Sequence, residues 1–298
     1  MDKKSIRYIL ELKNVCKTFT KSDFKLDNVS FSVPYGVIMG LVGKNGSGKT
    51  TTIKSILDII NIDKGGEIKL FEGERVDEIG LKNNIGVVFD SSCFSKSLTP
   101  KQISNIMAGI YQKWDRSKYV EFLNKFDLPI NQRVGTFSKG MLMKFSLSVA
   151  LSHSPKLLIL DEVTSGLDPV ARDDVLETLM DFIQDEKHSI IFSTHITSDL
   201  EKIADYITLM HQGKILLSIS KERLLSDFAI LRCKKSEFFK MDNKNFWAYL
   251  EKEYQVNVLV SNVEYLKSQY NTMVFDRVSI EELLTILIKG ESYERDFS

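Results

Sequence analysis

Gly43-Lys44-Asn45-Gly46-Ser47-Gly48-Lys49-Thr50 is the stretch that decides the fold. It matches the pattern GxxxxGK[ST], in which glycines let backbone amides curl around phosphate groups at the N-terminus of a helix. Residues 37–42 before it form a continuous apolar run, typical of a strand buried on both faces, and TTIKSILDII after it is typical of a helix. The stretch therefore predicts a phosphate-binding loop in which Lys49 reaches the outer phosphates and Thr50 a magnesium ion.

A second apolar run ends in two carboxylates. Residues 157–160, LLIL, lead directly into Asp161 and Glu162. Such a pair can hold magnesium through one carboxylate and polarise a water molecule with the next. An apolar strand that runs into acidic surface residues is also common, so this motif gains its weight from the phosphate-binding loop.

The rest of the first 219 residues alternates short strands with helices. Residues 6–40 alternate apolar and polar positions in short runs, which predicts antiparallel strands, and GEIKLFEGE is typical of a hairpin. Further buried strands are expected at 85–89 and 189–193, and a helix at about 170–186. This order of strand, helix and strand indicates a parallel sheet.

Helical periodicity dominates between the strands that carry these motifs. Residues 91–151 are expected to form an inserted helical subdomain, in which TPKQISNIMAGIYQKW starts with Thr99 as N-cap and Pro100 as first helical residue. The composition changes after residue 219. We therefore predict one domain at 1–219, which carries the phosphate-binding loop, and a small α/β accessory domain at 220–298.

Composition argues against several classes of protein. Forty basic residues balance forty acidic ones, so the net charge favours neither a nucleic acid nor an anionic surface as the main partner. Cys16, Cys93 and Cys233 lack any CxxC pairing, which fits a reducing cytosol better than a disulfide framework or a zinc site. The sequence has neither a signal-peptide pattern nor an apolar run of about eighteen residues, so any membrane role is expected to depend on a partner.

The motifs together resemble the ABC ATPase family over roughly residues 9–219. Their order is that of the family, with Ser165-Gly166-Leu167-Asp168 similar to its D-loop and His195 in FSTH similar to its switch histidine. The resemblance implies an α/β fold of the P-loop NTPase type, with an antiparallel β subdomain and an inserted α-helical subdomain. It also implies ATP and Mg²⁺ as cofactors.

The family's signature motif, usually LSGGQ, is present here as Phe137-Ser138-Lys139-Gly140-Met141. Ser138 and Gly140 keep the hydroxyl and the backbone amide that would bind the γ-phosphate of ATP held by the opposite subunit. Lys139 either adds charge or perturbs the fit. A signature of this type resembles export-type subunits, and we interpret it as a variant rather than as inactivation.

Two other positions leave alternatives open. Asp90 stands where most family members carry a glutamine that reaches magnesium, and it is either a metal ligand or an ordinary acid at the end of a strand. Phe19 stands where the family has an aromatic ring against adenine, but it is also suited to a core position, and Phe24 lies close by in the sequence.

The resemblance implies an ATPase that drives a membrane exporter. Glu162, His195 and Lys49 are the expected catalytic residues, and Thr50, Asp161 and Asp90 the expected metal ligands. The expected ATP-binding residues are Phe19, Gly43, Lys44, Asn45, Gly46, Ser47, Gly48, Lys49, Thr50, Thr51 and Asp168, with Ser138 and Gly140 serving the ATP of the partner.

The expected partners are a transmembrane permease subunit and a second ATPase subunit, in a homodimer or heterodimer, with no nucleic acid. The segment 91–111 is either a docking surface for the permease or simple helical packing. We expect the chain on the cytoplasmic face of the membrane, with a peptide or antimicrobial as cargo. The alternatives are a soluble ABC ATPase that acts on the ribosome or DNA, and a regulatory subunit with little turnover.

Overall fold

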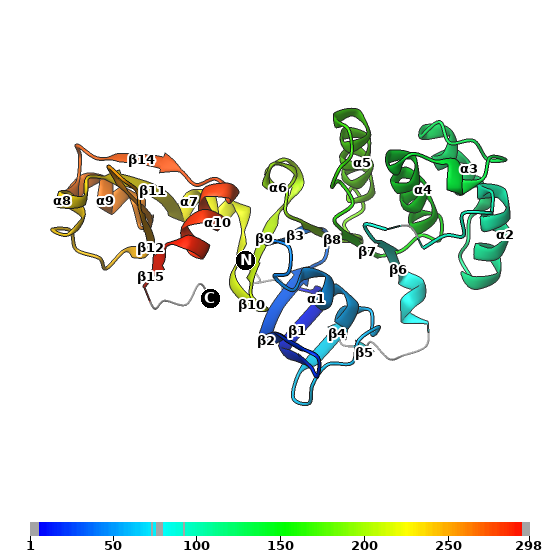
Figure 1. Ribbon diagram of the computed structural model, residues 1–298, viewed down its shortest axis with the longest axis horizontal. Coiled ribbons are helices and arrows are strands. Elements are labelled where there is room, and N and C mark those ends of the chain that lie inside the picture. The colour runs from blue at the N-terminus through cyan, green and yellow to red at the C-terminus, as the bar shows by residue number, and fades with distance from the viewer. Residues whose placement is uncertain (1–5, 73, 76–79, 92, 294–298) are drawn as a thin grey trace, which may run out of the picture.

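The computed structural model describes residues 6–72, 74–75, 80–91 and 93–293. Residues 1–5 of the N-terminal stretch, Gly73 of the predicted hairpin and Ser92 of the predicted helical insert lie outside this range. The described residues form an α/β fold, as the sequence predicts, and their strands form three sheets (Figure 1).

The central sheet has six strands in the order β10-β9-β3-β8-β7-β6. Its strands are β3 (Ile38–Val42), β6 (Ile85–Val88), β7 (Leu157–Asp161), β8 (Ser189–Thr194), β9 (Tyr206–His211) and β10 (Lys214–Ser220). All neighbours pair in parallel except β9 and β10, which form an antiparallel hairpin. Every residue of β3, β7 and β8 is buried, which confirms the prediction of strands covered on both faces.

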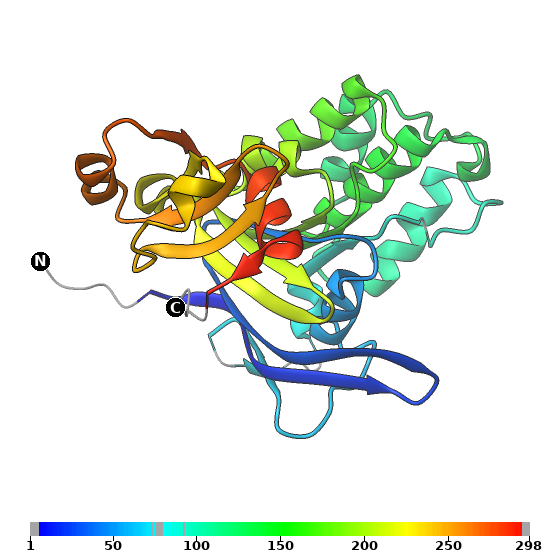
Figure 2. The same ribbon diagram turned by 60° about the vertical axis from the view of Figure 1, so that its left-hand side comes forward.

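A second, antiparallel sheet shares a hydrophobic core with the central sheet and helix α1. It has the order β2-β1-β4-β5, with β1 (Tyr8–Phe19), β2 (Ser22–Pro34), β4 (Glu67–Leu70) and β5 (Glu74–Arg75). Residues 6–40 thus contain antiparallel strands as predicted, although β1 and β2 make one long hairpin (Figure 2). Leu10 and Leu12 of β1 share a hydrophobic core with Met39 and Leu41 of β3.

The helical insert lies on the other side of strand β6 from the antiparallel sheet (Figure 1). Its helices are α2 (Pro100–Ile110), α3 (Arg116–Lys125), η2 (Val134–Thr136) and α4 (Lys139–Leu151), and α1 (Lys49–Ile56) and η1 (Leu81–Asn84) precede it in the chain. Helix α2 begins as predicted, with Thr99 and Gln102 in a capping box and Pro100 at its start. It ends before Tyr111, whose backbone is extended and whose ring stacks on His153 with 3.9 Å between ring centroids.

The C-terminal part is joined to the central sheet by shared packing. Helices α5 (Pro169–Phe182) and α6 (Thr197–Ile203) lead to α7 (Lys221–Asp227), α8 (Lys235–Phe238), α9 (Val263–Gln269) and α10 (Ile280–Lys289). The third sheet has the order β14-β11-β13-β12-β15, with β11 (Phe228–Cys233), β12 (Phe246–Glu251), β13 (Val256–Ser261), β14 (Val274–Arg277) and β15 (Glu291–Ser292).

Helix α10 connects the two regions. Leu283 and Ile286 of α10 belong to the same hydrophobic cluster as Leu200 and Ile203 of α6. The predicted domain boundary at residues 219 and 220 therefore stays a prediction, because one core crosses it. Among the described residues, no helix combines the length and the apolar character needed to cross a membrane.

The turn of the β9–β10 hairpin holds the phosphate-binding loop in place. Gly213 donates its backbone N–H to Ser47 O (2.8 Å) and accepts a hydrogen bond from Asp27 N (2.9 Å). Its φ is +77°, and a Cβ atom added here would lie 1.8 Å from Lys25 O. Only glycine fits this position without moving the backbone.

We predict that Gly213→Ala destabilises the protein by about 2 kcal/mol more than Gly65→Ala, because overpacking a close contact commonly costs 1–3 kcal/mol. Gly65 is the matched control, since its φ is also positive (+99°) but the space around it is open. Urea unfolding of the two variants measures the difference. Equal losses of stability would contradict the close approach at Gly213.

Candidate functional site

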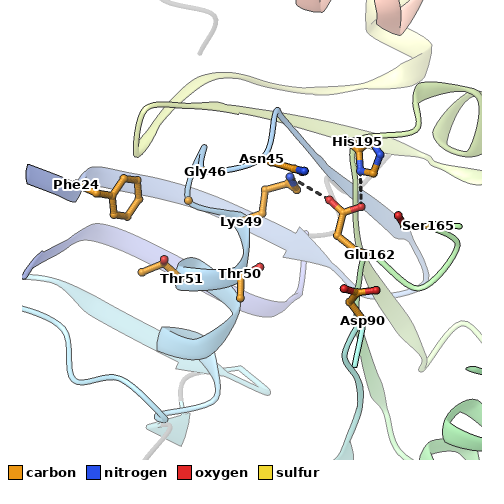
Figure 3. Close-up of a pocket in the computed structure, with 11 residues that line it drawn as sticks. Phe24, Asn45, Gly46, Lys49, Thr50, Thr51, Asp90, Glu162, Ser165 and His195 are labelled. Carbon is orange, nitrogen blue, oxygen red and sulfur yellow. Dashed lines mark hydrogen bonds and ion pairs between the residues drawn. The ribbon is translucent and has the colours of Figure 1, made fainter. Parts of the chain in front are cut away.

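A cavity of about 500 Å³ lies where the phosphate-binding loop faces the carboxyl ends of β6, β7 and β8 (Figure 3). Side chains and backbone from five separate segments line it, because parallel strands end at the same edge of the sheet. The lining residues are Phe24, Asn45, Gly46, Gly48, Lys49, Thr50, Thr51, Asp90, Glu162, Ser165 and His195.

Lys49, the first residue of α1, carries a buried charge at the centre of this cavity. Its side chain is 5% exposed. Its Nζ donates to Gly43 O (2.8 Å) and Lys44 O (3.3 Å), and lies 3.1 Å from Glu162 Oε1 in an ion pair rather than a directed hydrogen bond. A buried ammonium needs such partners, because desolvation strongly disfavours an uncompensated charge.

Glu162 lies between Lys49 and His195 (Figure 3). His195 Nδ1 donates to Glu162 Oε2 (2.6 Å). The φ of Glu162 is +56°, a left-handed conformation that costs a non-glycine residue of order 1–3 kcal/mol and is often found at functional sites. The contacts to Lys49 and His195 hold the carboxylate of Glu162 at the lining of the cavity.

Thr50 and Asp161 form the side of the cavity that suits a magnesium ion. Thr50 Oγ1 donates to Asp161 Oδ2 (2.7 Å), and Ser193 Oγ donates to Asp161 Oδ1 (2.9 Å). In the part of the chain that the structure describes, no three His, Cys, Asp or Glu side chains gather as a metal site. A hydroxyl and one or two carboxylates nevertheless fit Mg²⁺, which takes its remaining ligands from water and nucleotide phosphates.

The other predicted residues of the phosphate-binding loop lie around this centre. Asn45, Gly46, Gly48 and Thr51 line the cavity with Lys49 and Thr50. Gly43 and Lys44 line a second cavity of about 470 Å³, which lies between the loop, His195 and helix α10. Ser47 is 4% exposed, and its backbone carbonyl is held by Gly213.

The signature-like residues lie outside the cavity that Lys49 lines. Ser138 caps helix α4, since its Oγ accepts a hydrogen bond from Met141 N (3.2 Å). Asp168 caps helix α5 by accepting from Ala171 N (2.9 Å), and this hydrogen bond lowers the pKa of its carboxyl group. Gly140 lies close to Ala171. The two helix N-termini therefore stand side by side, away from Lys49 of the same chain.

Phe24, and not Phe19, is among the residues that line the cavity. The two rings contact each other with 6.3 Å between centroids. Phe24 lies at the opposite end of the cavity from Asp90 (Figure 3). The sequence predicts Phe19 as the ring against adenine because of its position relative to the family's motifs. Only the path of the β1–β2 hairpin shows which of the two rings lines the cavity.

Asp199 is a buried acid behind the site, and it belongs to no sequence motif from which its role could be predicted. Asp199 on α6 is fully buried, and its carboxylate accepts from Thr164 Oγ1 (2.7 Å) and from Arg172. Thr164 follows Glu162 closely, and Asp199 follows His195 closely. Asp199 thus ties together the two loops that carry the expected catalytic side chains, so we infer a positioning role for it.

The site defines a P-loop nucleotide-binding protein. A buried strand, a glycine-rich loop and a helix meet there with a second strand that ends in carboxylates, all at one cavity. Comparison with known proteins narrows this class. The family model described as ABC transporter matches residues 26–165. The lantibiotic transport ATP-binding protein SrtF of Streptococcus pyogenes is 34% identical over 70% of this chain and 90% of its own length. The chain therefore belongs to the ABC transporter ATP-binding family, and it is an ATPase of that family.

Other proteins support the same assignment. The bacitracin transport ATP-binding protein BcrA of Enterococcus faecalis is 28% identical over 84% of this chain and 80% of its own length. A solved structure of an ATP-binding subunit of an ABC transporter is similar with a TM-score of 0.65 and 27% identity, over 72% of this chain and 91% of the other. Subunits of this family bind ATP, dimerise and work with transmembrane permease partners.

We predict that Phe24→Ala weakens ATP binding by about tenfold or more, since stacking on a base contributes about 1–3 kcal/mol. Phe19→Ala should change the Kd by less than about twofold, because the ring does not line the cavity. Isothermal titration calorimetry measures both values. The reverse order of effects would assign adenine to Phe19.

Proposed function

We propose that this chain binds Mg²⁺-ATP in the cavity around Lys49 and hydrolyses it to drive export through a separate membrane subunit. The observation that carries the proposal is the continuous contact of Lys49, Glu162 and His195 across one cavity that Thr50 also lines. These residues supply a cation for phosphates, a carboxylate for water and a hydroxyl for the metal.

In this mechanism, ATP phosphates replace Glu162 as the partner of Lys49. Backbone amides of residues 45–50 would hold the phosphates at the N-terminus of α1, and Thr50 and Asp161 would hold Mg²⁺. The metal, when bound, neutralises charge on the β- and γ-phosphates.

Release from Lys49 leaves the Glu162 carboxylate free to accept a proton from the attacking water. His195 keeps its Nδ1–H on Glu162, and its other ring nitrogen, when it is protonated as well, would donate toward the γ-phosphate. Positioning and charge stabilisation thus supply most of the catalysis.

A complete site in this proposal needs a second ATPase subunit. Ser138 and Gly140 stand away from the cavity of their own chain, and the N-terminus of α4 that they form is suited to bind phosphate. The second subunit, identical or different, would present these groups to the γ-phosphate. Closure over ATP and reopening after hydrolysis would then move the attached membrane subunits.

We further propose export of an antimicrobial peptide or antibiotic. Support comes from the similarity to SrtF and BcrA, which are a lantibiotic and a bacitracin transport ATP-binding protein. A permease would hold the chain at the cytoplasmic face of the membrane. Helix α2 offers exposed Ile106 and Ile110 for that contact.

Glu162→Gln should slow magnesium-dependent ATP hydrolysis by about a hundredfold or more, since general-base catalysis contributes about 10²–10⁴-fold. The isosteric amide keeps the fold and the contact to His195, so ATP binding should persist and trap a dimer. Phosphate release and light scattering measure the two effects.

Glu177→Gln is the matched control, because Glu177 is an exposed glutamate on α5 outside the cavity. It should hydrolyse ATP like the wild type. If Glu162→Gln retains full turnover, the carboxylate is not the base. If the wild type binds ATP but neither hydrolyses it nor dimerises, even together with its permease, the regulatory alternative replaces this proposal.

A further inference from the structure

The two departures from the family's motifs contact each other. Asp90 follows β6, where a glutamine is usual, and Lys139 stands in the signature-like segment, where a glycine is usual. Asp90 Oδ1 lies 3.5 Å from Lys139 Nζ. Asp90 and Lys139 thus replace two neutral residues by opposite charges that lie in contact. This arrangement indicates that the two side chains act together.

The side chain of Lys139 crosses the loop that follows Glu162. Lys139 is the first residue of α4, and it extends over Gly166. A Cβ atom added at Gly166 would lie 3.1 Å from Lys139 Nζ, and Gly166 has a φ of +69°. Lys139 thus links the signature-like helix to Asp90, which lines the candidate ATP cavity.

Charge at the start of α4 explains why this pair forms. A lysine at the N-terminus of a helix is disfavoured by the helix dipole, and the first turn of α4 contains no acidic residue. Asp90 supplies the missing negative charge from another element. Asp90 also lines the cavity that Thr50 lines. Its carboxylate therefore lies between Lys139 and the side of the cavity where Mg²⁺ is expected.

We propose that Lys139 is a positioning residue that holds Asp90 away from the metal until Mg²⁺-ATP binds. This inference rests on the proposed function, because it takes Mg²⁺-ATP as the ligand of the cavity. Binding draws the Asp90 carboxylate toward the metal and opens the ion pair. The Lys139 ammonium is then free at the N-terminus of α4, where it faces the nucleotide of a second subunit.

The pair is weak enough to open. Both side chains are about half-exposed, at 58% for Asp90 and 50% for Lys139. Opening an exposed ion pair lowers ligand affinity by about twofold to fivefold. Nucleotide binding in one cavity therefore changes the charge that the same chain offers to its partner, which couples the two sites of a dimer.

The test is the Kd of Lys139→Gln for Mg²⁺-ATP, measured by calorimetry at a concentration where the chain is monomeric. The inference predicts binding about twofold to fivefold tighter than wild type, because no ion pair must open. Loss of a positive charge alone would weaken binding of an anion. The sign of the change therefore separates the two explanations.

Four comparisons complete the test. In EDTA, which removes Mg²⁺, ATP should bind Lys139→Gln no more tightly than wild type. In a protein that already carries Asp90→Asn, adding Lys139→Gln should not lower the Kd further. Lys139→Arg should restore the wild-type Kd. Lys144→Gln is the matched control on α4, because Lys144 pairs with Asp174 outside the cavity, and it should also leave the Kd unchanged.

The inference is overturned if Lys139→Gln binds Mg²⁺-ATP with unchanged or lower affinity than wild type. It is also overturned if Lys139→Gln raises the affinity by the same factor in the Asp90→Asn background. Failure of the wild type to bind Mg²⁺-ATP would instead overturn the proposed function. Thermal unfolding checks that each variant is folded at the temperature of the titration.

Discussion

The buried ammonium group of Lys49 is the constraint on which the rest of the site depends. A charge that is 5% exposed must be neutralised, and here two backbone carbonyls and Glu162 do so. ATP phosphates offer the same compensation with more negative charge. In the proposed function, binding therefore exchanges one anionic partner of Lys49 for another, and it releases Glu162, the proposed base.

The surrounding fold serves this exchange. Parallel strands β6, β7 and β8 end at one edge, so Asp90, Asp161 and His195 approach the loop from separate segments. Asp199 ties the loops behind Glu162 and His195 together, and helix α10 packs on the same helix α6. The C-terminal sheet therefore shares a hydrophobic core with helix α6, which follows His195 in the chain.

Local signals in the sequence predicted the strands, the phosphate-binding loop and the start of α2, because each depends on neighbours along the chain. Tertiary contacts decided the rest. Phe24 lines the cavity because of the path of a long hairpin, and α2 ends early where Tyr111 stacks on His153. Likewise, the sequence showed Asp90 and Lys139 as separate departures, since residues 49 positions apart gave no sign of contact.

The most direct test of the account is the Kd for Mg²⁺-ATP of Lys49→Ala compared with that of Lys44→Ala. Lys44 is the matched control, because it lies in the same loop with an exposed side chain. Loss of a buried phosphate partner should weaken binding about a hundredfold at Lys49 and by less than about threefold at Lys44. Equal affinities for the two variants would contradict the role of the buried ammonium as the phosphate partner.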